Sequence, residues 1–465
     1  MYLQFHGAAG EVTGSCHRLH VGNHDIVLDC GLFQGRRAEA NRQNRNVPDW
    51  AVHAQAVVLS HAHLDHSGNV PSLVKRGCQA NIFCTPATRD LCSVMLRDAA
   101  LLQEQDAQYI NRHNQRDGVT ERVEPLYDVE DAGRAVGQMI CLPLHRPLAI
   151  APGVQLTFYD SGHVLGSALS VLDLEENGRK VRLLFTGDLG RAELPLLGSP
   201  EVVPGVDVLL MESTYGDRQH PDISELDAEL GQIVNTTIGR GGRVYIPTFA
   251  LERAQEVLFA LVRLHDAAKI PHVPIYIDSP LAIAITEIYK LHPEGLAPDV
   301  RQKLFERSDP FSPPGLHYVS QIGASRQLQA ETHPCIVIAG SGMCEGGRIL
   351  HHFSTALARQ KNSVVVVGFM AKDTLGRRLL EGRSRVKVFG VERDVRASIH
   401  YVAGLSAHAD QDDLVTFAAD TARAGRLGRV ALVHGEPPAQ QALQQRLTTR
   451  GLAVVRAVQG ERLEL

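Results

Sequence analysis

The stretch Leu59-Ser60-His61-Ala62-His63-Leu64-Asp65-His66-Ser67-Gly68 constrains this chain more than any other. It follows an apolar run at residues 56–59, which predicts a buried strand because aliphatic and β-branched residues are packed together. The chain turns beyond that strand, so four polar side chains can converge instead of alternating between two faces: His61, His63, Asp65 and His66. Imidazole and carboxylate together suit zinc or a similar divalent ion. A histidine-rich turn without a metal is the alternative, but unpartnered converging polar groups would destabilise the fold.

The composition describes a globular protein of more than one domain. With 465 residues the chain is too long for one ordinary hydrophobic core, so two domains are expected. No apolar run approaches the roughly 20 residues that span a bilayer, and the first residues do not resemble a signal peptide, so we expect no membrane partner. The 8 cysteines include no Cys-x-x-Cys pair, which argues against a disulfide framework and a zinc ribbon and favours a cytoplasmic protein. The net charge of -5 gives no general attraction for nucleic acid, although a local groove can still be basic.

Further polar residues stand where apolar strands are predicted to end or beside glycines. Each of them alone has an ordinary interpretation, such as a turn cap for an aspartate. Catalytic groups at the ends of rigid strands are, however, what a preorganised site requires. The residues in such positions are Asp29, His163, Asp188, Glu212, His408 and His434.

The chain changes character near residue 217, where helices begin to alternate with buried strands. The runs at 335–339 and 364–367 are almost continuously apolar, which is typical of a parallel sheet covered by helices on both faces. From about residue 389, polar residues again stand at the ends of predicted strands, as they do before residue 217. We therefore expect a first domain at 1–216, an inserted α/β domain at 217–388, and a C-terminal part of the first domain at 389–465.

The motifs together resemble a known family. The pattern His61-x-His63-x-Asp65-His66, with Asp29 before it and His163 and Asp188 after it, is similar to that of the metallo-β-lactamase fold. The later motifs resemble those of the β-CASP nucleases: Glu212-Ser-Thr-Tyr-Gly, Pro247-Thr-Phe-Ala-Leu-Glu-Arg253, Asp278-Ser-Pro-Leu-Ala, Gly340-Ser-Gly-Met-Cys-Glu-Gly-Gly-Arg348, Thr374-Leu-Gly-Arg377, Ser406-Ala-His408-Ala-Asp and Val433-His434-Gly-Glu. The resemblance covers essentially the whole chain. It implies an α/β fold, in which a metallo-β-lactamase αββα sandwich carries an inserted α/β β-CASP domain with a parallel sheet flanked by helices.

The same resemblance implies a site with two Zn²⁺ ions per chain, although other divalent ions remain open. One ion would be held by His61, His63 and His163. The other would be held by Asp65, His66 and His434. Asp188 would bridge the two ions, and Asp29 would orient a ligand histidine by hydrogen bonding.

The implied activity is zinc-dependent hydrolysis of phosphodiester bonds in RNA. Two neighbouring metal ions lower the pKa of a water so that it can attack phosphorus near neutral pH. The leaving oxygen then needs a proton, for which His408 is the candidate, and Glu212 would orient His408 and keep it protonated. The expected catalytic residues are thus His408, Glu212 and Asp65.

Other functions remain open from the sequence. The DNA-processing branch of the family usually has valine where this chain has His434, so the histidine favours single-stranded RNA over a DNA substrate. A small-molecule hydrolase acting on thioesters or lactams and a non-catalytic scaffold are further alternatives, and the complete ligand set disfavours the scaffold. Endonucleolytic and 5′→3′ exonucleolytic cleavage are equally open, and so is a homodimer, for which the sequence shows no interface.

Several basic residues of the inserted domain have two interpretations. They could bind backbone phosphates or simply be solvated, ion-paired or packed: Arg253, Arg348, Arg377, Arg378, His351 and His352.

Overall fold

The computed structural model describes residues 1–35, 37–117, 120, 122–192, 194–221, 223–306, 308–368 and 370–465. The described chain forms two compact units, of which unit 1 comprises residues 1–219 and 408–465 and unit 2 comprises residues 220–407. The sequence predicts the second junction between residues 388 and 389, whereas the structure places it between Ala407 and His408. The physical reason is that β19 (Ser398–Tyr401) pairs in parallel with β16 (Ser363–Val366) and so belongs to the sheet of unit 2.

Unit 1 contains two seven-stranded sheets. The first sheet runs in the order β22 (Arg462–Glu464), β1 (Tyr2–Phe5), β2 (His17–Val21), β3 (His24–Leu28), β4 (Ala56–Val58), β5 (Asn81–Cys84) and β6 (Met139–Cys141). The second sheet runs in the order β21 (Val454–Arg456), β20 (Arg429–Leu432), β11 (Val208–Met211), β10 (Arg179–Phe185), β9 (Ala168–Glu176), β8 (Val154–Asp160) and β7 (Leu148–Ala151).

The two sheets of unit 1 pack face to face over one apolar core. Alternating residues point into it, as in β2, where His17, Leu19 and Val21 are buried and the residues between them are partly exposed. Leu172 of β9 and Leu210 of β11 reach the same core from the second sheet. Burying a side chain of this size contributes about 1.5–3 kcal/mol, so this layer is the main stabilising element of the unit.

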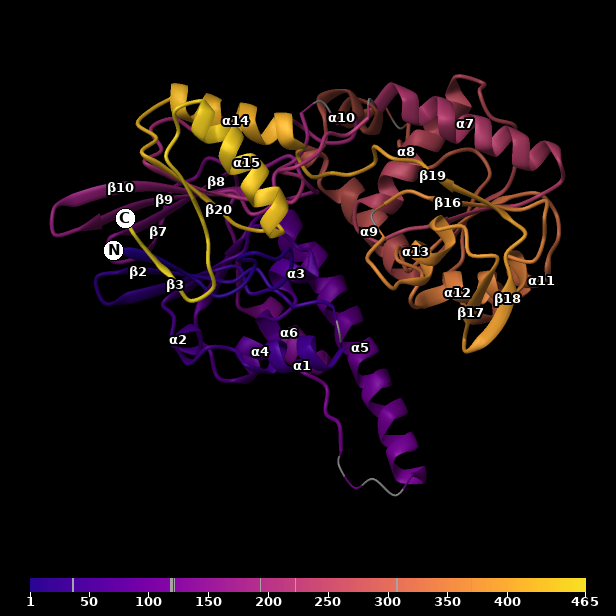
Figure 1. Ribbon diagram of the computed structural model, residues 1–465, viewed down its shortest axis with the longest axis horizontal. Coiled ribbons are helices and arrows are strands. Elements are labelled where there is room, and N and C mark those ends of the chain that lie inside the picture. Colours follow the sequence, from indigo (N-terminus) through magenta and orange to yellow (C-terminus); the bar gives the residue numbers. More distant parts are fainter. Residues whose placement is uncertain are drawn as a thin grey trace. The chain divides into compact units, whose positions relative to one another are not determined.

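Helices cover the outer faces of both sheets (Figure 1). Those near the first sheet are α1 (Arg37–Arg45), α2 (Asp49–Val52), α3 (Leu64–Ser67), α4 (Val70–Lys75), α5 (Pro86–Arg116) and α6 (Val129–Gly137). The second sheet packs against α14 (Gln411–Arg423) and α15 (Pro437–Thr449), whose apolar side chains share a core with it. The predicted αββα sandwich is confirmed.

The last part of the chain completes unit 1. β20 inserts between β11 and β21 with parallel pairing, and β22 pairs antiparallel with β1. Both sheets therefore combine strands that precede unit 2 in the sequence with strands that follow it.

Unit 2 is built on a six-stranded parallel sheet. Its order is β14 (Leu316–Tyr318), β13 (Ile275–Asp278), β15 (Ile336–Ala339), β12 (Val244–Pro247), β16 and β19. The central strands β12, β15 and β16 are buried on both faces, which explains their continuous apolar sequences. A separate hairpin joins β17 (Arg385–Val388) to β18 (Val391–Asp394).

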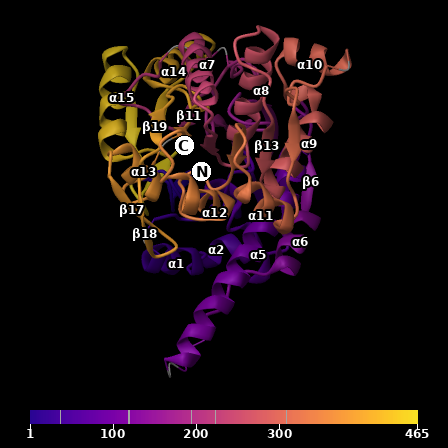
Figure 2. The ribbon, with the colours of Figure 1, turned by 90° about the vertical axis from the view of Figure 1, so that its right-hand side faces the viewer.

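The helices of unit 2 lie on both faces of its sheet (Figure 2). They are α7 (Ile223–Gly239), α8 (Arg253–Asp266), α9 (Pro280–Leu291), α10 (Pro298–Phe305), α11 (Ile322–Ala330), α12 (Gly347–Ala356) and α13 (Leu375–Leu380), with a 3₁₀ turn at Pro293–Gly295. The predicted parallel sheet flanked by helices is confirmed. Among the described residues of both units, no helix is long and apolar enough to cross a membrane.

Candidate metal centre

The loop after β4 and the start of α3 carry four of the predicted ligands: His61, His63, Asp65 and His66. The backbone holds this segment in place, because the Cys30 N–H donates to the carbonyl of His66 at 2.8 Å. The two segments approach so closely that a methyl group on Gly31 would lie 1.6 Å from the backbone oxygen of Asp65. The conformation of the ligand loop is thus fixed by its own backbone contacts.

A first group of ligand atoms gathers in unit 1 within 4.8 Å of one another, and it consists of His61, His63, His163 and Asp188. Nε2 of His61 lies 3.1 Å, and Nε2 of His163 lies 3.3 Å, from Nδ1 of His63. Oδ2 of Asp188 lies 3.5 Å from Nε2 of both His61 and His163. The structure therefore brings together side chains from three separate segments of the chain.

A second group consists of Asp65, His66 and His434. Nε2 of His66 and Nε2 of His434 are 3.2 Å apart, and Oδ2 of Asp65 lies 3.7 Å from Nε2 of His434. His434 follows β20 and has a φ of 47°. Its position at the end of a strand added late in the chain explains why it reaches ligands near residue 65.

Asp188 faces both groups. Its Oδ2 points to the first group, whereas its Oδ1 lies 3.2 Å from His66 Nε2 and 3.2 Å from His434 Nδ1. The side chain is 1% exposed, so this carboxylate is enclosed by imidazoles. Asp188 therefore lies within reach of both groups, and its bridging role stays a prediction.

The electrostatics of the two groups differ. Burial lowers the pKa of His61 and His163 well below the usual value and lowers the pKa of His63 to about 4, so these imidazoles are neutral. Burial also lowers the pKa of His66, but the charges of Asp188 and Asp29 outweigh burial and raise it well above the usual value. In the first group, neutral imidazole lone pairs beside the Asp188 carboxylate are therefore the environment that a cation requires.

The donor set fits divalent metal ions. Two ring nitrogens that face each other at 3.1–3.3 Å share at most one proton, so lone pairs in both groups point toward common centres. A cation placed there accepts these lone pairs and balances the buried carboxylates. Imidazole and carboxylate without thiolate suit zinc among the common ions.

Asp29 holds His66 in a defined orientation. Its Oδ2 accepts hydrogen bonds from His66 Nδ1 at 2.7 Å, Ser60 Oγ at 2.9 Å and Ser15 Oγ at 3.2 Å. Its Oδ1 accepts from the backbone N–H of Ser60 at 2.8 Å. Because Nδ1 of His66 donates to Asp29, Nε2 is the nitrogen directed at the site.

His408 and Glu212 form a hydrogen-bonded pair beside the candidate ligands. Nδ1 of His408 lies 3.1 Å from Oε1 of Glu212, and its ring centroid lies 4.5 Å from that of His163. Glu212 also accepts the backbone N–H of Leu189 at 2.7 Å, which fixes the carboxylate. Burial lowers the pKa of His408, but Glu212 and Asp188 outweigh burial and raise it to about 10. With Nδ1 donating to Glu212, Nε2 of a protonated His408 remains as a donor at the site.

Two hydroxyl residues support the site without having been predicted. Ser60 Oγ contacts Asp29 and also lies 3.0 Å from Nδ1 of His61. Thr214 Oγ1 lies 3.2 Å from Nδ1 of His434. Each stands next to or within a motif, at Ser60-His61 and Glu212-Ser-Thr214, and that adjacency is the signal from which they could have been found.

The basic candidates from the inserted domain all lie in unit 2. Arg348 and His352 bind the buried Asp278, with Nη1 of Arg348 at 2.6 Å and Nε2 of His352 at 2.7 Å from its carboxylate. Arg253 donates to Glu256 at 2.7 Å and is 10% exposed, so its main contact is an internal ion pair. The remaining candidates are more accessible, with side chains 50% exposed at Arg377 and 42% at Arg378.

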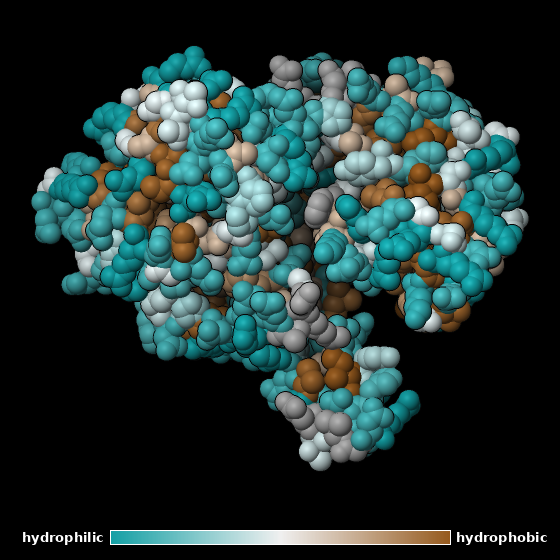
Figure 3. Space-filling view, viewed as in Figure 1, coloured by the Kyte–Doolittle hydropathy of each residue, from teal (hydrophilic) through white to brown (hydrophobic). Residues whose placement is uncertain are grey.

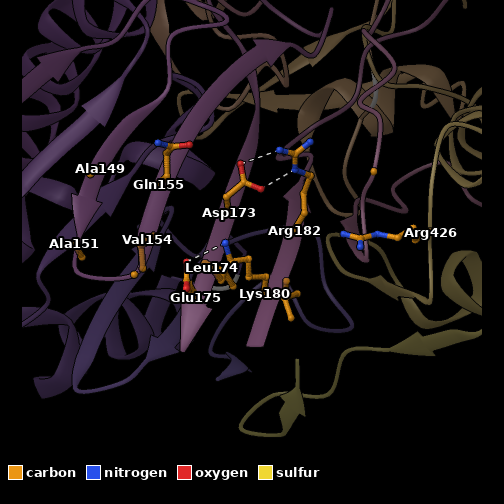
Figure 4. Close-up of a pocket in the computed structure, with 13 residues that line it drawn as sticks. Ala149, Ala151, Val154, Gln155, Asp173, Leu174, Glu175, Lys180, Arg182 and Arg426 are labelled. Atoms are coloured by element: carbon orange, nitrogen blue, oxygen red, sulfur yellow. Dashed lines mark hydrogen bonds and ion pairs between the residues drawn. The ribbon is translucent and has the colours of Figure 1, made fainter. Parts of the chain in front are cut away.

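A pocket of about 780 Å³ opens on β7–β10 of unit 1, and none of its lining residues is a candidate ligand (Figure 4). Four of its charged side chains pair with each other, and Arg426 pairs with Asp207 outside the lining. Nε of Arg182 donates to Asp173 at 2.7 Å, and Lys180 lies 3.5 Å from Glu175. The pocket therefore offers no chemistry beyond that of the metal centre.

Comparisons with known proteins identify the family of this chain. Three family models match: a Beta-lactamase superfamily domain at residues 24–248, a Beta-Casp domain at 254–379, and a Zn-dependent metallo-hydrolase RNA specificity domain at 392–457. The chain is 36% identical over 455 residues to Ribonuclease TTHA0252 of Thermus thermophilus, with 98% of each protein covered. It is 31% identical over 418 residues to an RNase J-like protein of Methanocaldococcus jannaschii, covering 89% of this chain and 88% of that protein.

Two further comparisons show similarity to an archaeal protein in sequence and to a solved structure in fold. Transcription termination factor FttA of Methanothermobacter thermautotrophicus is 31% identical over 423 residues, which are 88% of this chain and 63% of that protein. A crystal structure of a protein of unknown function from Enterococcus faecalis V583 superposes with a TM-score of 0.58 at 13% identity, which supports the fold alone. The sandwich with its second α/β unit agrees with the family models, and the chain belongs to the β-CASP family of the metallo-β-lactamase superfamily.

Proposed function

We propose that this chain is a zinc-dependent ribonuclease that hydrolyses phosphodiester bonds of single-stranded RNA with two Zn²⁺ ions. The observation that carries the proposal is the position of the Glu212–His408 pair beside two ligand groups that share Asp188. The ligands alone would suffice to bind metal ions. A poor leaving group, such as the alkoxide of a nucleoside, also needs a proton donor. The names of the relatives and the RNA specificity domain support RNA as the substrate.

The ligands divide between two ions in this proposal. His61, His63 and His163 would hold one ion. Asp65, His66 and His434 would hold the other, and Asp188 would bind both. Zinc in these positions would supply Lewis acidity that lowers the pKa of a water and neutralises charge on a phosphoryl group.

The protein side chains then carry the remaining roles. Asp29 keeps Nε2 of His66 directed at the site through the 2.7 Å hydrogen bond to Nδ1. Glu212 fixes Nδ1 of His408, so Nε2 is the atom that donates a proton to the leaving oxygen. As the oxygen of a deprotonated water forms a bond to phosphorus, the P–O bond to the leaving oxygen breaks, that oxygen takes up the proton, and the imidazole becomes neutral. Asp65 acts both as a ligand and, through its contact with His434, as a group that orients it.

The test is cleavage of 5′-labelled single-stranded RNA and DNA of equal sequence by zinc-loaded protein, with zinc per chain measured in parallel. We expect RNA cleavage by the wild type, and product lengths will separate endonucleolytic from 5′→3′ exonucleolytic cutting. His66→Ala should lose zinc and activity together, whereas His408→Asn should keep zinc and lose about 10²–10⁴-fold in rate. His333→Ala, whose side chain is 41% exposed in unit 2, is the matched control and should behave as wild type. Intact RNA after incubation with zinc-loaded wild type would disprove the proposal.

A further inference from the structure

Positive charge in this acidic chain is concentrated in one short segment of unit 2. Residues 377–396 contain seven Lys or Arg and three Asp or Glu, a net charge of +4 in a chain whose total is -5. The segment comprises most of α13 and the β17–β18 hairpin, and we call it the basic hairpin. Its cations are Arg377, Arg378, Arg383, Arg385, Lys387, Arg393 and Arg396.

The fold separates the apolar and the charged sides of the basic hairpin. Val386 and Val388 are buried in the core of unit 2, and Leu379 of α13 packs into the same core. Arg385 and Lys387 alternate with the two valines and point outward. The hairpin is thus anchored by its apolar residues, which holds its cations on the surface of the unit.

The acidic residues of the basic hairpin do not neutralise it, because two of the three are each shared by two arginines. Glu381 lies 3.1 Å from Nε of Arg377 and 3.9 Å from Nε of Arg383. Asp394 lies 3.2 Å from Nε of Arg385 and 3.1 Å from Nη2 of Arg396.

These shared ion pairs leave the cations available to a ligand. The four arginine side chains are 50–67% exposed, and each guanidinium has five N–H donors, more than these contacts use. Exposed ion pairs contribute little to stability. The planar guanidinium groups suit phosphate oxygens, to which they can donate two N–H bonds at once.

The tip of the basic hairpin presents an aromatic ring that the turn itself does not require. Phe389 and Gly390 form the two-residue turn with φ values of 51° and 75°. Such turns favour Asn, Asp or Gly at the first position, because bulky residues are disfavoured at positive φ. Phe389 is nevertheless 56% exposed, beside Val391 at 51%, and its ring centroid lies 4.7 Å from that of His351 on α12. In Figure 3, apolar side chains lie among hydrophilic ones at the end of the unit where Figure 1 places this hairpin.

We propose that the basic hairpin is a second contact surface for single-stranded RNA, which binds backbone phosphates through its arginines and stacks one base on Phe389. Exposed cations next to an exposed aromatic ring are the combination that binds single strands, because phosphates are anionic and every base has a stacking face. The proposal rests on the proposed function only in taking RNA as the substrate. It assigns to Arg377 and Arg378, the two accessible arginines among the sequence candidates, a phosphate-binding role outside the metal centre.

The experiment measures binding of the full zinc-loaded chain to labelled U₁₅ in the His408→Asn background, in which cleavage is slow. The test variant is Arg383→Gln/Arg385→Gln/Lys387→Gln. The matched control, with the same loss of charge at residues 53–76% exposed in unit 1, is Arg134→Gln/Lys180→Gln/Arg423→Gln. Removing three phosphate contacts should reduce the slope of log K against log salt by about 2 and weaken binding at least about tenfold at physiological salt. The control should change affinity less than about twofold.

A second variant, Phe389→Asn, keeps a residue that suits the turn and removes the ring. It should weaken U₁₅ binding roughly 5- to 150-fold, while binding of inorganic polyphosphate should not change. Equal affinities of the test and control triple variants, or unchanged U₁₅ binding by Phe389→Asn with a normal circular dichroism spectrum, would overturn the proposal. If both variants weaken binding of polyphosphate but not binding of U₁₅, the surface binds a different polyanion and the RNA assignment is refuted. Cleavage of a trinucleotide by the same variants with His408 intact should be unaffected, so failure at this surface is distinguishable from failure of the proposed function.

Discussion

Replacing Asp29 tests whether a buried carboxylate outside the ligand groups controls metal affinity. Asp29 is fully buried and accepts four hydrogen bonds, three at Oδ2 and one at Oδ1. Its φ of 58° lies in the left-handed region, which asparagine tolerates better than most residues, so Asp29→Asn changes the charge with little backbone strain.

The expected losses of folding free energy and zinc affinity follow from the hydrogen bonds that Asp29→Asn removes or weakens. An asparagine keeps three bonds if its oxygen takes the place of Oδ2, and its NH₂ group then faces the backbone N–H of Ser60. Leaving that buried donor unsatisfied costs about 1–3 kcal/mol of folding free energy. The hydrogen bond to Nδ1 of His66 also becomes neutral and about half as strong. Loss of such an orienting partner typically lowers metal affinity 10–100-fold, and we expect that range for zinc at this site.

The assay is competition for zinc between the folded protein and a chromogenic chelator, together with urea unfolding of the zinc-loaded chain. Ser15→Ala is the matched control, because it removes only the 3.2 Å bond to the same carboxylate and should change zinc affinity less than about threefold. Wild-type zinc affinity in Asp29→Asn would refute the conclusion that Asp29 orients His66 for metal binding.

Three further predictions concern the fold around the centre. Gly31→Ala should destabilise the chain by about 3 kcal/mol or more and weaken zinc binding, because the new methyl group would overlap the backbone of Asp65. The control Gly133→Ala on α6 has open space around the new methyl group and should be neutral or stabilising by up to about 1 kcal/mol in the same unfolding assay. Burial raises the pKa of Asp160 to about 6, so between about pH 4 and 6 the folded chain holds a proton that the unfolded chain has released, and this stabilising contribution is lost as pH rises. As pH rises from about 4 to 7, the free energy of unfolding of Asp160→Asn should therefore increase relative to that of the wild type by up to about 3 kcal/mol. Parallel curves of unfolding free energy against pH would contradict this account. Removal of zinc with a chelator should lower the Tm of unit 1, where all candidate ligands lie, and a Tm independent of zinc would argue against binding at this centre.

The sequence predicted the first four candidate ligands because they lie close together in the chain. His61, His63, Asp65 and His66 stand within six residues, so a single turn after β4 brings them together whatever the rest of the chain does. The more distant members were predicted by motif resemblance. Their positions depend on strand pairing, as with His434 at the end of β20, and pairing is not encoded in any single stretch.

The features that the sequence did not predict depend on long-range contacts. The role of Arg348 is decided by Asp278, which lies 70 positions earlier, and no local pattern distinguishes that ion pair from a phosphate-binding arginine. The second junction was placed too early because β19 is short and only its pairing with β16 assigns it to unit 2. Ser60 stands next to His61 in the sequence, but its hydrogen bond to Asp29, 31 positions earlier, depends on how the chain folds.

The pairing of β11 with β20 also has a consequence for synthesis of the chain. β11 ends at Met211 and β20 begins at Arg429, so 217 residues must be made between the two strands. At roughly 5–20 residues per second, the edge of β11 waits about 10–45 s on the ribosome for its neighbour. Unit 2 can fold during that interval, while unit 1 still lacks both His408 and His434. In the proposed function, a nascent chain therefore stays unable to cut RNA at least until His434 has been made.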